Sequence, residues 1–173
     1  MGGGIVWPAG FTCIVDPDPI DDPLLSELKA YWDLKRGARA MPRRADIDPL
    51  DLRKHLGNLV MIEVLAGQDD FRYRLIGTHV AAQHGRDSTG KTVRELYAAT
   101  DPVIFDWSMT VLRNVVAHRR PVRASNRLRM VDRDYTTSDQ LHLPLSEDGE
   151  AVSMILCESR FAAASRLAAD RNE

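Results

Sequence analysis

Apolar side chains recur along this chain with two different spacings, one helical and one extended. Helical spacing follows the pair Asp22-Pro23 and stops at Gly37, and it returns after the pair Asp101-Pro102. A capping residue followed by proline at the first helical position is typical of a helix start. The pattern therefore predicts an amphipathic helix near the N-terminus and a longer one that ends at an Arg-Arg-Pro stop.

Five shorter runs are rich in β-branched and aromatic residues and are bounded by turn-forming segments. They cover residues 59–65, 71–76, 122–130, 135–145 and 151–161. The connections within the first pair and among the last three runs are short enough only for antiparallel pairing. Between residues 77 and 100 the helical pattern is fragmented, with Thr78 as a candidate cap and one or two turns at residues 93–97.

The order of these segments predicts one α+β domain. Its five-stranded antiparallel sheet is expected to be covered on the concave face by short helices and one long helix, with an N-terminal flanking helix beside it. The Gly-, Pro- and Asp-rich opening is typical of a flexible arm, and a short helix is expected at residues 50–55. The expected division is an arm at 1–22, the flanking helix and a connector at 23–57, the core at 58–161 and a tail at 162–173.

Composition limits the classes of function. With 173 residues, 44% hydrophobic and 28% charged, and a formal net charge of −2, the chain fits a single globular domain without an overall attraction for nucleic acid. The two cysteines, Cys13 and Cys157, form neither a disulfide framework nor a CxxC metal motif. The sequence shows no secretory leader and no apolar run of membrane-spanning length, so a cytoplasmic protein is expected.

The order of strands and helices resembles the PAS sensor fold, and a set of short motifs is more specific. These motifs are Tyr31-Trp32 with Arg39, MPRR at residues 41–44, DIDP at 46–49, FRYRLIGT at 71–78, GRD at 85–87 and Thr89-Gly90. Together they resemble a bacterial family of stand-alone PAS-like proteins over residues 24–161. The resemblance implies a non-catalytic sensory or regulatory domain in signal transduction, which binds a small ligand, a protein partner or both.

In PAS domains the pocket lies between the inner face of the sheet and the helices, and signals leave through flanking helices, often across a dimer. On this chain the resemblance implies a mostly apolar pocket with a few polar neighbours. The candidates are Tyr73, Leu75, Thr78, His79, Trp107, Val111, Val115, Tyr135, Leu141 and Met154. The candidate surface for a signalling partner or a second copy is made of Leu28, Tyr31 and Trp32.

Residues 85–92 read GRDSTGKT and match the phosphate-loop pattern GxxxxGK[ST] in full. A phosphate loop needs a strand that enters it directly and a helix that leaves it, so that backbone N–H groups meet the phosphate. Residues 79–84 separate this segment from the preceding strand, and the closing strands are joined by turns instead of crossover helices. A nucleotide-binding protein that uses Gly85 to Thr92 is therefore an alternative, behind the sensory interpretation.

The histidines and cysteines show no cofactor or metal motif. The five histidines, at positions 55, 79, 84, 118 and 142, lack HExxH or Cys/His spacing. Haem-binding PAS domains hold iron with a histidine of the long helix, but His118 lies at the basic last turn of that helix, where the helix dipole explains it. Flavin photosensors of this fold use a reactive cysteine near residues 85–87, where this chain has none. No obligatory cofactor is expected, and neither are haem, flavin or metal.

No serine lies in a GxSxG context, and the sequence assigns no catalytic residue. Two groups of arginines allow a second alternative, a binder of an anionic messenger or of nucleic acid. They are Arg36, Arg39, Arg43 and Arg44, and Arg119, Arg120, Arg123, Arg127, Arg129 and Arg133. Because Arg123, Arg127 and Arg129 fall on one side of a strand, we favour a solvated face paired with carboxylates, and nucleic acid is not expected.

Overall fold

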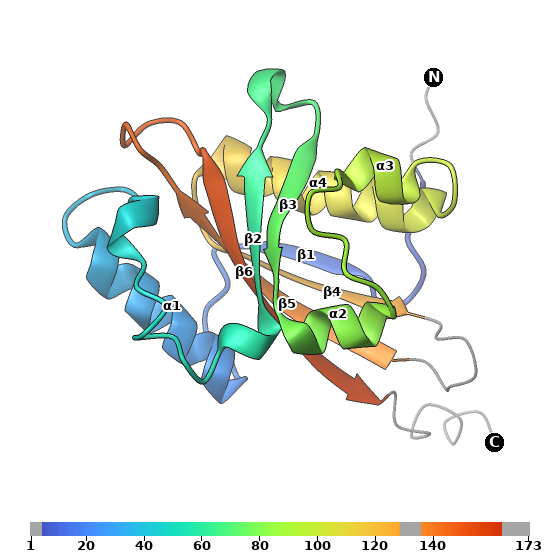
Figure 1. The fold of residues 1–173 in the computed structure, drawn as a ribbon, viewed down its shortest axis with the longest axis horizontal. Coiled ribbons are helices and arrows are strands. Elements are labelled where there is room, and N and C mark those ends of the chain that lie inside the picture. The colour runs from blue at the N-terminus through green and yellow to red at the C-terminus, as the bar shows by residue number, and fades with distance from the viewer. Residues whose placement is uncertain (1–4, 129–135, 164–173) are drawn as a thin grey trace.

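The structure, a computed structural model, describes residues 5–128 and 136–163 (Figure 1). Within this part of the chain, six strands form one antiparallel sheet in the order β1-β4-β5-β6-β2-β3. Their bounds are β1 Thr12–Val15, β2 Leu59–Val64, β3 Phe71–Ile76, β4 Val122–Leu128, β5 Thr136–Leu145 and β6 Met154–Ala163. Strands β2 to β6 are the five predicted ones, so the predicted α+β fold around an antiparallel sheet is confirmed.

Four α-helices and three short 3₁₀ turns connect the strands within the described residues. They are α1 Pro23–Arg36, η1 Arg44–Asp46, η2 Leu56–Asn58, η3 Ala66–Gln68, α2 Thr78–His84, α3 Val93–Tyr97 and α4 Pro102–His118. The Asp22 carboxylate accepts the backbone N–H groups of Leu24 and Leu25 at 2.9 and 3.0 Å. Asp101 accepts the N–H of Ile104 at 3.0 Å in the same way. Both predicted helix starts are therefore confirmed.

Helices cover both faces of the sheet. In Figure 1, α1 lies at the left of the sheet, α4 runs across the upper middle of the view past β2 and β3, and α3 lies at the right. Trp32 of α1 donates its indole N–H to the backbone carbonyl of Pro144 in β5 at 2.8 Å. On the other face, α4 packs against β1, β4 and β5. Because successive side chains of a strand point to opposite faces, the central strands contribute to two separate layers of core.

The first strand lies within the segment that was predicted to be a flexible arm. β1 pairs with β4 along its whole length, so the predicted five-stranded sheet is corrected to six strands. The segment is also fixed to α4, because Trp107 donates its indole N–H to the carbonyl of Thr12 at 3.0 Å and Trp7 donates to Asp106 at 2.8 Å. Four residues carry too few alternating positions to indicate a strand by periodicity, particularly beside repeated prolines.

Two smaller predictions differ from the structure. Residues 50–55 form consecutive turns, in which Asp51 and Leu52 donate to carbonyls three residues earlier, instead of a helix. So short a stretch between a proline and a glycine does not stabilise a helix by itself. Thr78 is the first residue of α2, and its N-cap is Gly77, which offers no side-chain hydrogen bond.

Gly77 lies where α2 begins against η2, and a side chain there would collide with backbone. A methyl group at this position would overlap the carbonyl oxygens of Leu56 and Gly57. The Gly77 amide also donates to the carbonyl of Leu59 at 2.7 Å, which fixes the close approach. We expect Gly77→Ala to lower the free energy of unfolding by about 1–3 kcal/mol, as overpacking does, in urea denaturation. Gly57→Ala is the matched control, because its methyl group would meet only the ring of His79. Equal losses of unfolding free energy in the two variants would show that the collision with backbone at Gly77 is not the cause.

Candidate ligand-binding site

A pocket of about 140 Å³ lies between the sheet and the helices α2, α3 and α4. Strands β2 and β3 close one side of it, β4, β5 and β6 form its floor, and α4 supplies most of the opposite wall. This is the place between sheet and helices where the resemblance implied a pocket. On β5 and β6, however, the lining side chains are mainly polar, whereas the prediction named the apolar residues Leu141 and Met154.

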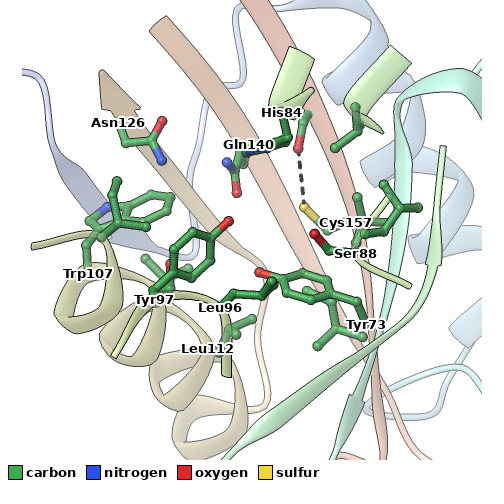
Figure 2. Close-up of a pocket in the computed structure, with 18 of the residues that line it drawn as sticks. Tyr73, His84, Ser88, Leu96, Tyr97, Trp107, Leu112, Asn126, Gln140 and Cys157 are labelled. Carbon is green, nitrogen blue, oxygen red and sulfur yellow. Dashed lines mark hydrogen bonds between the residues drawn. The ribbon is translucent and has the colours of Figure 1, made fainter. Parts of the chain in front are cut away.

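The floor of the pocket is polar. It is made of Asn126 from β4, Gln140 and His142 from β5, and Cys157 and Ser159 from β6, which together are called the polar floor below. Figure 2 labels Asn126, Gln140 and Cys157. In the register of the sheet, Gln140 lies opposite Ser159 and His142 lies opposite Cys157. All of them except Gln140 are buried. Because buried polar groups cost free energy unless they are bonded, the polar floor requires hydrogen-bond partners.

Two buried atoms of the polar floor lack such a partner, namely Asn126 Oδ1 and His142 Nδ1. Both side chains are only 3% exposed. By contrast, Gln140 donates to the hydroxyl of Ser138 at 2.8 Å. Nearly all buried polar groups in folded proteins are paired with protein or with ordered water. Each of these atoms marks a place where a bound molecule would complete the hydrogen bonding, and the row of Gln140 and Ser159 lies between the two places.

Burial keeps three titratable side chains of the pocket, His142, Cys157 and Tyr73, uncharged. It lowers the pKa of His142 to about 4, although a hydrogen bond of the imidazole with the Val122 backbone opposes the shift, so the imidazole is neutral at pH 7. Burial raises the pKa of the Cys157 thiol to about 12, although its contact with Ser159 opposes the shift. Burial is also the main reason why the pKa of the Tyr73 hydroxyl lies well above its usual value. The interior of the pocket thus offers polar groups without net charge.

The walls of the pocket are mostly apolar and aromatic. Figure 2 shows the rings of Tyr73, Tyr97 and Trp107 around the space in front of the polar floor. The charged residues of the lining, Arg86 and Asp101, are exposed and carry opposite charges. An apolar enclosure with a few placed polar groups is typical of small-molecule sites.

Three of the predicted pocket residues line this pocket, namely Tyr73, Trp107 and Val111. Val115 belongs to the same face of α4, but it is fully buried in the core beyond the pocket. The structure thus places part of the long helix α4 along one wall of the pocket.

Three further predicted residues do not line the pocket within the described part of the chain. Thr78 and His79 are exposed on the first turn of α2, because this helix turns Val80 toward the core instead. Met154 is half-buried at the start of β6 and does not line the pocket. Tyr135 lies outside the described residues.

Leu141 was predicted to line the pocket, and the structure corrects this. It lies between Gln140 and His142 on β5, so its side chain points to the opposite face, where it is fully buried on the side of α1. The prediction placed the apolar residues of β5, which include Leu141, on the pocket face. In the structure the polar residues that alternate with them, Gln140 and His142, face the pocket. The signal in the sequence was the set of polar residues at every second position, from Ser138 to His142.

Leu75 is corrected for another reason, a β-bulge. Tyr73 and Leu75 were expected to share one face, but they pair with consecutive residues of β2, so Arg74 is an extra residue in the ladder. The bulge moves Ile76 into the pocket beside Tyr73 and leaves Leu75 49% exposed. A bulge of this kind changes the alternation without a sign in the local sequence.

The candidate interface residues lie on α1. Leu28 and Trp32 are 0% and 3% exposed and pack against the rest of the chain. Tyr31 is partly exposed, and its hydroxyl accepts the N–H of Asp48 at 3.0 Å and donates to Asp51 at 3.2 Å. An interface through Leu28 and Trp32 therefore requires that α1 move away from the sheet, whereas Tyr31 is accessible as it stands.

The segment with the phosphate-loop pattern connects α2 to α3. A helix enters it in place of a strand, and the helix that leaves it has five residues. Two of its backbone N–H groups are already hydrogen-bonded within the chain. Gly90 donates to the carbonyl of Tyr73 at 2.7 Å, and Thr92 donates to the Glu95 carboxylate at 2.8 Å. The strand–loop–helix context that phosphate binding requires is absent from this segment.

Many arginines pair with carboxylates of the same chain. Arg123 donates to the Asp139 carboxylate at 3.0 and 2.7 Å and also lies 2.6 Å from Asp21, and these bonds raise its pKa. Ion pairs are also formed by Arg36, Arg39, Arg74, Arg94 and Arg120. Arg129 and Arg133 lie outside the described residues. These pairs support the solvated-face interpretation of the arginine groups.

Within residues 5–128 and 136–163, no group of three or more histidine, cysteine or acidic residues is placed to hold a metal ion. No helix in the same part of the chain combines the length and the apolar character needed to cross a bilayer.

Comparisons with known proteins identify related folds. A family model described as PAS domain matches residues 20–157. Among solved structures, an RNA-binding light-oxygen-voltage receptor matches 90% of this chain at 14% identity with a TM-score of 0.53, and the chain spans 40% of that receptor. A light-oxygen-voltage (LOV) protein of Rhodobacter sphaeroides matches 70% of this chain, and 72% of its own length, at 13% identity with a TM-score of 0.48. No curated protein matches the chain.

Proposed function

The chain belongs to the PAS domain family, and from this premise we propose that it is a non-catalytic sensory or regulatory domain that binds a small molecule above the polar floor. The observation that carries this proposal is the pair of buried atoms without partners, Asn126 Oδ1 and His142 Nδ1. A pocket filled only by side chains gains nothing from keeping two polar groups unpaired. A molecule bound over the polar floor that pairs with either group explains why that group is there.

The size of the pocket argues for a small ligand. A cavity of about 150 Å³ holds one benzene-sized molecule, and this pocket measures about 140 Å³. Drug-sized molecules occupy roughly 300–1,000 Å³. The proposal therefore favours a ligand smaller than the three-ring system of a flavin or the haem macrocycle. Cys157, the cysteine of the lining, is held as a thiol by its raised pKa and is not poised to react with a flavin.

Strand β6 connects the pocket to the opposite face of the sheet. Cys157 and Ser159 face the pocket, while Glu158 between them points to the α1 side and lies 2.8 Å from Nδ1 of His55. We include in the proposal that a ligand bound against β6 changes the packing under α1. The signal would then leave through a protein partner or a second copy that contacts the surface around Tyr31.

A fragment screen with a blocked pocket tests the proposed function. Ser108 lines the pocket on α4, so the ring of Ser108→Phe would occupy the cavity. In ligand-observed NMR with soluble single-ring compounds, we expect compounds that bind the wild-type protein to lose affinity at least about tenfold in this variant, a loss equivalent to about 1.4 kcal/mol. Ala117→Phe, on the exposed side of the same helix, should bind like the wild type. The proposal is wrong if no compound binds the wild-type protein, or if Ser108→Phe binds equally well.

A further inference from the structure

One end of the polar floor restricts the chemical class of the ligand, and this step rests on the proposed function. Asn126 on β4 lies opposite Ser138 on β5, whereas His142 lies four residues farther along β5, opposite Val122. A rise of about 3.3 Å per residue separates these two places by roughly 13 Å along the strand. A single-ring molecule therefore pairs with one of the two groups and not with both.

The neighbours of Asn126 favour its end of the floor. Gln140 donates its side-chain N–H to the hydroxyl of Ser138 at 2.8 Å. Because Ser138 lies opposite Asn126, this bond turns the carboxamide of Gln140 along β5 toward Asn126. Opposite side chains of an antiparallel pair have Cβ atoms about 5 Å apart. Two carboxamides therefore lie at the same end of the polar floor, whereas the imidazole of His142 already bonds the Val122 backbone.

The carboxamide of Asn126 determines which polar group a ligand must carry. The side chain is buried, and its Oδ1 has no hydrogen-bond partner. Rotation about χ2 lets a carboxamide present either its oxygen or its NH₂ group to the pocket. A hydroxyl group pairs with either end because it is both a donor and an acceptor, and a carboxamide does so with its N–H and C=O groups. An apolar molecule of the same size would leave Asn126 buried and unpaired.

The rings beside this end favour a flat molecule. In Figure 2 the carboxamides of Asn126 and Gln140 lie above the rings of Trp107 and Tyr97. The indole N–H of Trp107 is already bonded to the Thr12 carbonyl, so Trp107 offers apolar ring surface to a ligand. Aromatic walls bind planar molecules by stacked or edge-to-face contacts. The volume of about 140 Å³ admits one ring.

The charges around the pocket favour an uncharged molecule. Burial raises the pKa of the Tyr97 hydroxyl, and a hydrogen bond from Arg86 opposes the shift, so the guanidinium already has a partner. Asp101, also in the lining, carries the opposite charge, and both of these charged side chains are exposed. An ion bound against the buried carboxamide of Asn126 would lose its water shell without gaining a buried partner of opposite charge.

We propose that the Asn126 end of this pocket binds an uncharged single-ring compound that carries one hydroxyl or carboxamide group. The polar group pairs with Asn126 beside Gln140, and the ring packs against Trp107 and Tyr97. His142 lies too far along β5 to share this contact.

NMR titration at pH 7 with two matched pairs of probes tests this ligand class. Phenol and toluene have the same ring and nearly the same size, but only phenol carries a hydroxyl group. Benzamide and benzoate have nearly the same shape, but only benzoate carries a charge. We expect phenol to bind about threefold to tenfold more tightly than toluene, the range for one buried hydrogen bond. Benzamide should bind more tightly than benzoate.

The variant Asn126→Leu should remove the preference for the hydroxyl group. In this variant phenol should bind no more tightly than toluene, while toluene keeps or gains affinity. Asn114→Leu on α4 is the matched control, because its amide donates to the carbonyl of Thr110 at 2.9 Å and does not line the pocket. The control should keep the wild-type preference for phenol.

The stability of Asn126→Leu separates a ligand-binding role from a structural one. Because Asn126 Oδ1 has no partner in the ligand-free protein, its removal should leave the melting temperature unchanged or higher. A lower melting temperature together with lost toluene binding would show a structural role instead.

Three further results would contradict the ligand class. Phenol would bind the wild-type protein no better than toluene, benzamide would bind no better than benzoate, or the preference for phenol would survive in Asn126→Leu. In each case Ser108→Phe still decides the proposed function, because a blocked pocket excludes all four probes.

Discussion

The His55→Ala variant is expected to lose about 3–5 kcal/mol of unfolding free energy at neutral pH, the usual result of leaving a buried charge without its partner. His55 is 1% exposed and Glu158 is 0% exposed, and His55 Nδ1 lies 2.8 Å from Glu158 Oε2. The other carboxylate oxygen of Glu158 has no partner in the described structure. Without the imidazole, the whole carboxylate would be buried and uncompensated.

The loss should depend on pH in a defined direction. Burial raises the pKa of Glu158 above its ordinary 4.5, and the hydrogen bond to His55 opposes that rise. Removing His55 takes away the opposing effect, so the pKa in the folded variant rises further. Between 4.5 and this raised pKa the folded state binds more protons than the unfolded state, and the variant therefore gains stability as pH falls. In urea denaturation the deficit relative to the wild-type protein should be greatest near pH 8 and should shrink toward pH 5.

Two further variants show whether the deficit comes from the uncompensated carboxylate. Replacing both residues, in His55→Leu with Glu158→Leu, removes the charge together with its partner and should restore most of the stability. Glu158→Gln combined with His55→Ala should lose most of the pH dependence. A deficit in His55→Ala that is constant from pH 5 to pH 8 would show that the cavity left by the ring matters, and not the charge.

The second large effect is expected at Trp32, where alanine should cost about 3–5 kcal/mol, as it does for other buried tryptophans. The Trp32 side chain is 3% exposed, and its indole N–H bonds the Pro144 carbonyl of β5 at 2.8 Å. Truncation removes apolar contact and leaves that carbonyl without its donor. Chemical denaturation measures the loss, and Leu34→Ala on the exposed side of α1 should stay within about 0.5 kcal/mol of the wild type.

Hydrogen exchange distinguishes this anchoring role from the interface role predicted for the same residue. If Trp32 anchors α1, the amides of residues 27–36 should exchange faster in Trp32→Ala while the oligomeric state in light scattering stays unchanged. If Trp32 serves an interface instead, the oligomeric state or partner capture should change while exchange in α1 stays slow. The second result would show that the helix leaves the sheet in the assembled form.

The elements of the fold could be predicted because their signals are local. The starts of α1 and α4 depend on Asp22, Asp101 and the prolines that follow them, and each cap accepts N–H groups of its own first turn. The antiparallel order of β4, β5 and β6 follows from short connections. Helix caps and short connections each depend on a few consecutive residues, so they can be recognised without knowledge of tertiary contacts.

The lining of the pocket could be predicted only in part, because it depends on which face of each strand meets which helix. Alternation divides β5 into two sets but does not say which set faces α4, and the apolar set with Leu141 was assigned to the wrong side. The bulge at Arg74 changes the phase of β3 and excludes Leu75. Tyr73 and Trp107 were recognised because a large aromatic residue on the correct element belongs in a pocket wall more often than a small one does.

The short strand β1 gives the sheet a protected border. It covers the outer side of β4, and at four residues it offers little free edge of its own to another chain. A truncated chain that begins after residue 15 would leave β4 as an open edge and uncover Trp107, whose indole bonds the Thr12 carbonyl. Strand-to-strand aggregation is the known hazard of such an edge. Truncated forms of this domain should therefore retain the segment from Trp7 onward if they are to stay dispersed at high concentration.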